Sequence, residues 1–326
     1  MTVRGAVMTL VFTGVLNALS AQEVQLVKGV SVELLSQQEG AKFLGSPDAF
    51  VKSLSPFDRS ARLQVGRPVG QEEYLNHVRA QVIDWKAEEE KKLRQCLKKV
   101  RELLRDIKLP WPKRIVLIKT TGKEEGGAAY TRRNGIVLPV DRLKQAEARL
   151  ERLLLHELFH VLSRANPGLA TRLYGVIGFE KAPDLNFPEK LLPRKLTNPD
   201  APFSRHVIEV EHKKARVKVA PILYSRAANY DADKGGPFFR YLIFRLLVLD
   251  SNDLSRAARN ADGGLTLLKP DEVKGFREKI GRNTGYIIHP EETMADNFVF
   301  LVMSKSDLPN PEIINKMRKI LAEKTD

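Results

Sequence analysis

Leu153 to Leu162 reads LLLHELFHVL, and this motif governs the interpretation of the whole chain. His156 and His160 are four residues apart, so on an α-helix they stand one turn apart on the same face. Two imidazole nitrogens at that spacing can reach one metal ion, at roughly 2.0–2.1 Å for zinc. Glu157 projects beside them, where it can take a proton from a water molecule at the metal. The motif therefore predicts a helix that carries a metal site.

The apolar surroundings of this motif strengthen the interpretation. Leu and Phe side chains flank the two histidines and the glutamate on both sides in the sequence. Burying two imidazoles and a carboxylate among such residues costs several kcal/mol unless they find partners. A metal ion is one partner for all of them. The alternative is a pair of core histidines that are hydrogen-bonded to their neighbours.

A hydrolytic zinc site also needs a third protein ligand and a fourth position open to water. The extended pattern HExxHxxGxxH is absent, because Ser163 replaces its glycine and Asn166 its third histidine. A second segment, His289 to Phe298 (HPEETMADNF), has a proline suited to the first turn of a helix. Glu292 and Asp296 would share one face of that helix. Glu292 can then bind the metal while Asp296 accepts the spare N–H of a ligating histidine.

The two motifs together, HExxH at 156–160 and ExxxD at 292–296, resemble the gluzincins, the thermolysin-like zinc metallopeptidases. The resemblance implies Zn²⁺ as cofactor, His156, His160 and Glu292 as its ligands, Glu157 as general base and Asp296 as the partner of a ligating histidine. It also implies a zincin-like catalytic domain in which the metal-binding helix lies beside a mixed sheet. Strands mixed with helices in no strict βαβ order independently favour an α+β fold.

Several residues near the second motif are left with alternative roles. The competing third ligands are Glu291, His289, Glu180 and Asp184. Glu291 is expected to be a charge in the first turn of its helix, favoured by the helix dipole. Tyr286 is the expected hydrogen-bond donor to the oxyanion, because some gluzincins carry a Tyr or His shortly before the third ligand; His289 is its rival. His206 and His212 are expected to face solvent from a strand.

The remaining elements place this site in a larger domain. Residues 22–110 are expected to hold short strands and loops, followed by one long amphipathic helix over 71–108 that proline ends at Pro110. A catalytic domain over 111–326 would carry an insertion around 180–285. Asn134-Gly135 predicts a hairpin, and Gly126 to Tyr130 is a candidate edge strand for substrate. Strands are expected over 114–121, 128–132, 135–140, 206–212, 215–224 and 239–249, and helices over 141–164 and 311–324.

Composition excludes several classes of protein. Cys96 is the single cysteine, so neither an intrachain disulfide nor a Cys-rich metal cluster can form, and a buried, inert thiol is expected. No GxxxxGK[ST] run is present, which excludes a P-loop nucleotide hydrolase. The net charge of +14 is scattered and comes with no nucleic-acid-binding signature, so nucleic acid is not an expected partner.

The N-terminus is typical of a secretory signal peptide. Arg4 precedes an apolar run from Gly5 to Leu16, and small residues follow up to Ala21. The run is shorter than the roughly 20 apolar residues that a spanning helix needs. Cleavage after Ala21, or after Ser20, is expected, with an uncleaved anchor as the alternative. The mature chain would then have no integral membrane segment.

These inferences lead to one expected function and two alternatives. We expect an exported zinc metallopeptidase, periplasmic or extracellular, that acts on a peptide or protein substrate through Glu157 as general base. The first alternative is an inactive zincin-fold module for binding or assembly in the cell envelope. The second is a basic envelope protein in which HExxH is accidental. Residues 22–70 could serve as a propeptide, and the oligomeric state is left open.

Overall fold

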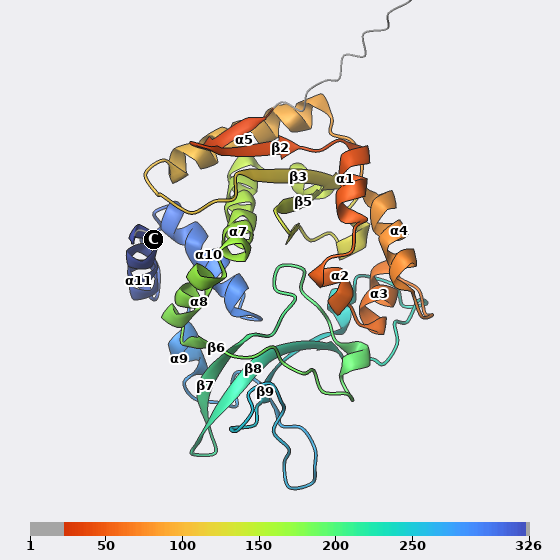
Figure 1. Cartoon of the computed structure of the whole chain (residues 1–326), viewed down its shortest axis with the longest axis vertical. Helices are drawn as coiled ribbons and strands as arrows, with labels where there is room; N and C mark the ends of the chain where they lie inside the picture. Colours follow the sequence, from red (N-terminus) through yellow and green to blue (C-terminus); the bar gives the residue numbers. More distant parts are fainter. Residues whose placement is uncertain (1–22, 324–326) are drawn as a thin grey trace, which may run out of the picture.

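The computed structural model describes residues 23–323, which form an α+β fold with two five-stranded sheets. The first sheet lies in the upper half of Figure 1 and the second in the lower half. Helix α7 (Glu147–Ala165) packs against the first sheet, and α8 (Pro167–Val176) contacts the second. Consecutive helices therefore connect the two halves of the molecule.

The first sheet is mixed, as expected. Its order is β1-β2-β3-β5-β4, with β2, β3 and β5 parallel and the two outer strands antiparallel to their neighbours. The strands are β1 (Val24–Val27), β2 (Val30–Leu34), β3 (Arg114–Thr120), β4 (Tyr130–Arg132) and β5 (Gly135–Pro139). The predicted hairpin is confirmed, and Arg133 in its turn adopts a φ of 52°. The edge strand is β4; Gly126 to Ala129, expected to be part of it, precede it as a loop.

Both faces of this sheet are covered, because β3 sends alternate side chains into two apolar cores. Ile115 and Leu117 pack with α5 (Ala87–Leu104) and α7. Val116 and Ile118 pack on the other face with α1 (Gln37–Leu44), α2 (Ala49–Ser53) and α4 (Gln71–Gln81). This strand is therefore apolar at successive positions, as a strand buried on both faces must be.

The N-terminal part corrects two expectations. Three helices, α1, α2 and α3 (Pro56–Leu63), occupy a region in which only strands and loops were expected. Ser36-x-x-Glu39 and Ser55-x-x-Asp58 begin α1 and α3 as capping boxes, a signal readable in the sequence. The single helix expected over 71–108 is divided into α4 and α5, because Val82 leaves the helix to pair with Thr120. Its apolar stripe and the buried thiol of Cys96 are confirmed.

The second sheet is antiparallel, in the order β10-β9-β8-β7-β6. Its strands are β6 (Phe179–Lys181), β7 (His206–His212), β8 (Ala215–Ser225), β9 (Leu242–Val248) and β10 (Leu267–Leu268). The chain between β6 and β7 rises from this sheet toward α7 (Figure 1). The remaining helices are α6 (Val140–Leu143), α9 (Phe276–Ile280), α10 (Pro290–Val302) and α11 (Pro311–Ala322), with short 3₁₀ turns at Lys123–Glu125, Leu192–Arg194 and Phe238–Tyr241.

Two expectations concern membranes and export. The predicted signal peptide, residues 1–21, lies outside the described residues. Within residues 23–323, no helix combines the length and the apolar composition that a membrane crossing requires.

Candidate metal centre

The HExxH motif lies on α7, as expected. This helix begins at Glu147 rather than at residue 141, because Val140–Leu143 forms a separate turn. His160 and Glu157 are buried, while His156 is partly exposed at the surface of the helix bundle. Asn166 and Pro167 end α7 and begin α8. The motif is thus held on a rigid, largely buried helix.

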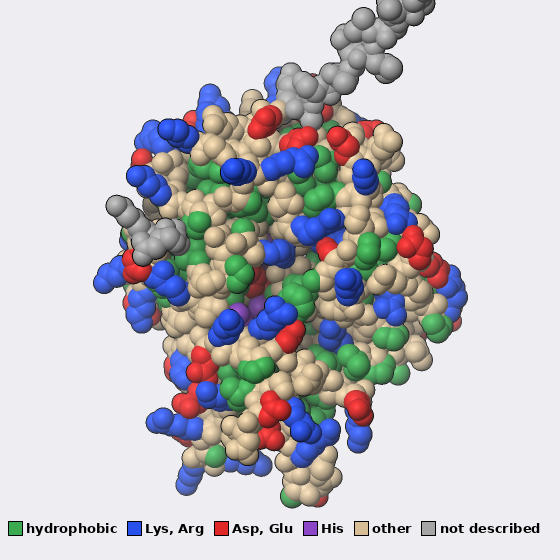
Figure 2. All heavy atoms as spheres, in the orientation of Figure 1, with side chains coloured by type: hydrophobic (Ala, Val, Ile, Leu, Met, Phe, Trp, Pro, Cys, Tyr) green, Lys and Arg blue, Asp and Glu red, His purple; other side chains and the backbone are tan. Residues whose placement is uncertain are grey.

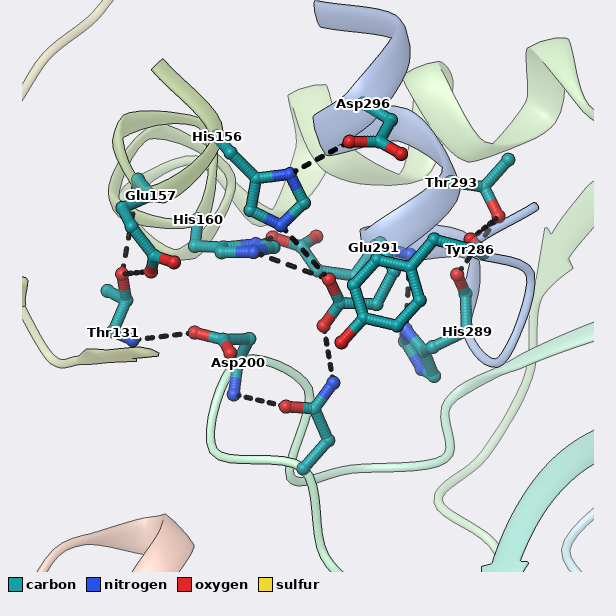
Figure 3. Close-up of polar contacts among 12 residues, drawn as sticks. Thr131, His156, Glu157, His160, Asp200, Tyr286, His289, Glu291, Thr293 and Asp296 are labelled. Atoms are coloured by element: carbon teal, nitrogen blue, oxygen red, sulfur yellow. Dashed lines mark hydrogen bonds and ion pairs between the residues drawn. The ribbon is translucent and has the colours of Figure 1, made fainter. Parts of the chain in front are cut away.

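Helix α10 brings Glu292 to the same point. Glu292 Oε2 lies 3.2 Å from His156 Nε2 and 3.6 Å from His160 Nε2. These three atoms lie within 4.8 Å of one another, a spacing at which they could hold one metal ion. Figure 3 shows the two imidazoles and the carboxylates of α10 converging between the helices. The structure therefore brings together the three residues that the sequence named as ligands.

The hydrogen bonding of one nitrogen in this cluster tests whether the residues fit a metal. Within the described part of the chain, His160 Nε2 is buried and has no hydrogen-bond partner. Leaving such a polar atom unsatisfied costs roughly 1–3 kcal/mol. Two neutral imidazoles and a carboxylate are a donor set that zinc prefers, and a zinc ion would satisfy this nitrogen. The residues present thus fit the metal.

Each histidine is oriented by a carboxylate on its other nitrogen. His156 Nδ1 lies 3.2 Å from Asp296 Oδ1, and His160 Nδ1 lies 2.7 Å from Glu291 Oε1. When Nδ1–H donates to these oxygens, both Nε2 atoms are left free for a metal. Burial would lower the pKa of each histidine, but the surrounding carboxylates outweigh it and raise both. Asp296 thus makes the contact with a histidine of α7 that the sequence predicted for it.

Glu291 corrects the expectation that it is only a first-turn charge. It is buried, and besides His160 it accepts hydrogen bonds from Ser163 Oγ and the Tyr174 hydroxyl. Ser163 stands where the extended zinc-binding pattern has glycine, and here its hydroxyl supports the carboxylate that orients His160. Nothing in the sequence connects Glu291 with His160, because their contact depends on how α7 and α10 pack.

We expect Glu291→Ala to lower zinc affinity by about 10- to 100-fold, because His160 loses the group that fixes its tautomer. Glu291→Gln should lower it less, since an amide oxygen still accepts the Nδ1 proton. Competition with a chromogenic chelator measures both affinities. Glu312→Ala, at an exposed first-turn position of α11, is the matched control. Equal affinity in Glu291→Ala and wild type would show that Glu291 has no orienting role.

Glu157 lies beside the ligands and is held by the edge strand. Its Oε2 accepts a hydrogen bond from Thr131 Oγ1 at 2.9 Å, and Thr131 belongs to β4. Burial raises the pKa of the Glu157 carboxyl to about 7, against the opposing effect of His156. The carboxyl that the sequence named as general base is therefore positioned by the strand that borders the cleft.

Tyr286, the other expected catalytic residue, lies beside one of the proposed ligands. Its ring stacks beside His156, with centroids 6.1 Å apart and an interplanar angle of 15°. The side chain is 41% exposed, and Figure 3 shows its hydroxyl directed toward the interior of the cluster. Its rival, His289, instead caps α10, where its Nδ1 accepts the Glu291 N–H at 3.1 Å.

The other competing residues lie elsewhere. Glu180 pairs with Lys218, and Asp184 pairs with Arg205, both near the second sheet. His206 and His212, which were expected to face solvent, are only partly exposed. His206 contacts α8, because its Nε2 lies 3.3 Å from Thr171 Oγ1.

Sequence reasoning missed two residues on the segment between β6 and β7. Asn198 Nδ2 donates a hydrogen bond to Glu292 Oε1. Asp200 Oδ1 accepts the backbone N–H of Thr131 at 2.6 Å. Carboxylate oxygens of Asp200 and Glu157 and a ring nitrogen of His160 lie within 4.8 Å of one another. Both residues come from a loop with no motif, so only the tertiary structure connects them with the metal centre.

No family model, curated protein or solved structure matches this chain. The function proposed below therefore rests on the chemistry of its own residues.

Basic side chains line a cavity beside the candidate centre. Figure 2 shows histidine side chains in a hollow near the middle of this face, with Lys and Arg side chains on both sides. A cavity of about 610 Å³ adjoins the centre here, bounded by Ser163, Glu291 and Asp200. Its basic lining residues are Arg132, Arg133, Arg164, Lys181 and Arg205. A cavity with a basic lining thus lies next to the candidate metal centre, on the side of Glu291 and Asp200.

Proposed function

We propose that the chain is a zinc metallopeptidase with a zincin-like catalytic domain, exported through the N-terminal signal. The observation that carries the proposal is the convergence of His156 Nε2, His160 Nε2 and Glu292 Oε2, with Glu157 alongside. Three ligands and an adjacent carboxylate are what metal-assisted hydrolysis requires. The edge strand next to this cluster supports a peptide as substrate, because an extended chain can add its backbone hydrogen bonds there.

Each residue then has a definite task. His156, His160 and Glu292 would hold a zinc ion, which would supply Lewis-acid chemistry to the scissile carbonyl and to an attacking water molecule. Glu157 takes the proton from that water and passes it to the leaving amine. Tyr286 donates a hydrogen bond to the carbonyl oxygen as negative charge develops on it. Asp296 and Glu291 hold the protons on the outer nitrogens of the two histidines.

The first test is bound zinc per chain, measured by elemental analysis after purification in zinc-containing buffer. We expect about one zinc per chain in wild type, because three ligands converge on one point. Glu292→Ala removes one ligand, so its zinc should be lost on dialysis that wild type withstands. Glu312→Ala is the matched control. A well-folded wild type that binds no zinc would reject the metallopeptidase.

A further inference from the structure

The segment Thr197–Ala201 lies directly over the metal centre. From this segment, Asn198 binds the ligand carboxylate of Glu292, and Asp200 reaches the group formed by Glu157 and His160. The backbone of Asp200 is also bonded to Asn198, whose side-chain Oδ1 accepts the Asp200 N–H at 3.0 Å. Two polar side chains of one short loop are thus directed at the atoms that would hold and use the metal.

The same segment lines two cavities. Pro199 and Asp200 line both the cavity of about 610 Å³ and a second cavity of about 60 Å³. The second cavity is bounded by Ala129 and Tyr130, at the start of the edge strand, and by Tyr286. Pro199 and Asp200 therefore form a wall common to the two cavities.

Asp200 occupies the hydrogen-bonding position that an extended peptide would use. Strand β4 is at the edge of the first sheet, so the N–H of Thr131 points away from its partner β5. In strand addition, this N–H would donate a hydrogen bond to a backbone carbonyl of the substrate. In the structure a carboxylate oxygen of Asp200 accepts it instead, at 2.6 Å.

The segment is held at both ends. Thr197 donates its N–H and hydroxyl to the Asp58 carboxylate, at 3.1 and 2.8 Å, and its carbonyl accepts from Arg62 at 2.9 Å. Arg164 at the end of α7 donates to the carbonyls of Pro199 and Asp200, at 3.1 and 3.0 Å. These contacts fix the backbone of the segment. The positions of Asn198 and Asp200 beside the centre are therefore set by the fold.

We propose that Thr197–Ala201 is a resident pseudo-substrate that fills the peptide groove, with Asp200 supplying the protein's own carboxylate next to the metal. This inference rests on the proposed zinc site. An extended peptide must displace Asn198 and Asp200 before its backbone carbonyls can reach the Thr131 N–H and the metal site. The resting enzyme is therefore inhibited by its own chain.

The test compares Asp200→Ala with wild type, using full-length, zinc-loaded protein and acetohydroxamic acid as a small zinc-binding probe. We expect the probe to bind at least about tenfold tighter to the variant by calorimetry, since about tenfold corresponds to losing one competing contact of 1.4 kcal/mol. Zinc content should be unchanged, and cleavage of a mixed peptide library should rise. Asp262→Ala removes an equal charge from an exposed loop and is the matched control.

Three outcomes would overturn the proposal. Equal probe affinity in Asp200→Ala and wild type would show that Asp200 does not compete for the centre. Loss of zinc in the variant would make Asp200 a required ligand rather than an inhibitor. If Asp200→Ala does not fold, Asn198→Ala replaces it, and an unchanged affinity there would contradict the inference. Absence of zinc from wild type, by contrast, rejects the metal site itself. Retained zinc and tighter probe binding without cleavage would show that Asp200 competes for the zinc site but would reject the peptidase.

Discussion

Glu157→Gln is expected to lower kcat for peptide hydrolysis by about 100- to 10,000-fold, while zinc stays bound. The amide cannot take a proton from water at neutral pH, so the reaction loses its general base. It has nearly the same shape as the carboxylate, and its oxygen can still accept the hydrogen bond from Thr131 Oγ1. The three proposed ligands are untouched. The effect should therefore be on the chemical step rather than on the metal.

The measurement combines kcat on a cleaved peptide with zinc content of the same preparation. Glu147→Gln, an exposed first-turn position on the same helix, provides the control for a change of charge on α7. A variant with full zinc and wild-type kcat would remove Glu157 from the mechanism. A variant that loses its zinc would instead indicate that Glu157 contributes to binding the metal.

The cluster of His156, His160 and Glu292 could be anticipated from sequence because each half of it depends on short-range geometry. Helical periodicity alone places His156 above His160, and Glu292 above Asp296. Only the meeting of the two helices had to be assumed, and the structure places Glu292 Oε2 3.2 Å from His156 Nε2. Strands with clear alternation, such as β7 and β8, were predictable for the same reason: the signal lies within the element.

The contacts that could not be predicted all join distant parts of the chain. Glu291 looks like any acidic residue at a helix start until α7 places His160 and Ser163 against it. Asp200 meets Thr131 because the loop between β6 and β7 of the second sheet extends to β4, at the edge of the first sheet. The division of α4 from α5 has a similar origin, since Val82 leaves a helical pattern to pair with Thr120. Tertiary contacts override local preference in each case.

A different kind of miss concerns the N-terminal helices. Here the information was local, because Ser36 and Glu39 bond reciprocally at the start of α1, as do Ser55 and Asp58 at the start of α3. Capping boxes are sequence signals for a helix start. The glycine, proline and serine residues of this region favoured loops instead. In these two-turn helices the capping box was the better signal than the nearby glycine, proline and serine residues.

The start of α3 also leads to the largest expected effect on stability. Arg62 is buried and donates to Asp58 Oδ1 at 2.6 Å and to both carboxylate oxygens of Glu125, at 2.6 and 2.8 Å. Its guanidinium lies 4.4 Å from the ring centroid of Phe238, in the 3₁₀ turn that precedes β9. Coulombic attraction to Glu125 and Asp58 overcomes the burial that would lower the Arg62 pKa and raises it. The side chain is therefore a cation at all accessible pH values.

Arg62→Met should lower the free energy of unfolding by about 3–5 kcal/mol, because it leaves two carboxylates buried without their cation. Methionine keeps much of the volume, so the loss reports the charge rather than a cavity. Chemical denaturation of the zinc-saturated protein measures it. Arg67→Met breaks an exposed ion pair with Glu73 and should have a far smaller effect. Equal losses in the two variants would show that the buried network contributes no more than a surface pair.

Arg62 also donates a hydrogen bond to the carbonyl of Thr197. Arg62→Met should therefore loosen the segment Thr197–Ala201 and bring the affinity for acetohydroxamic acid closer to that of Asp200→Ala.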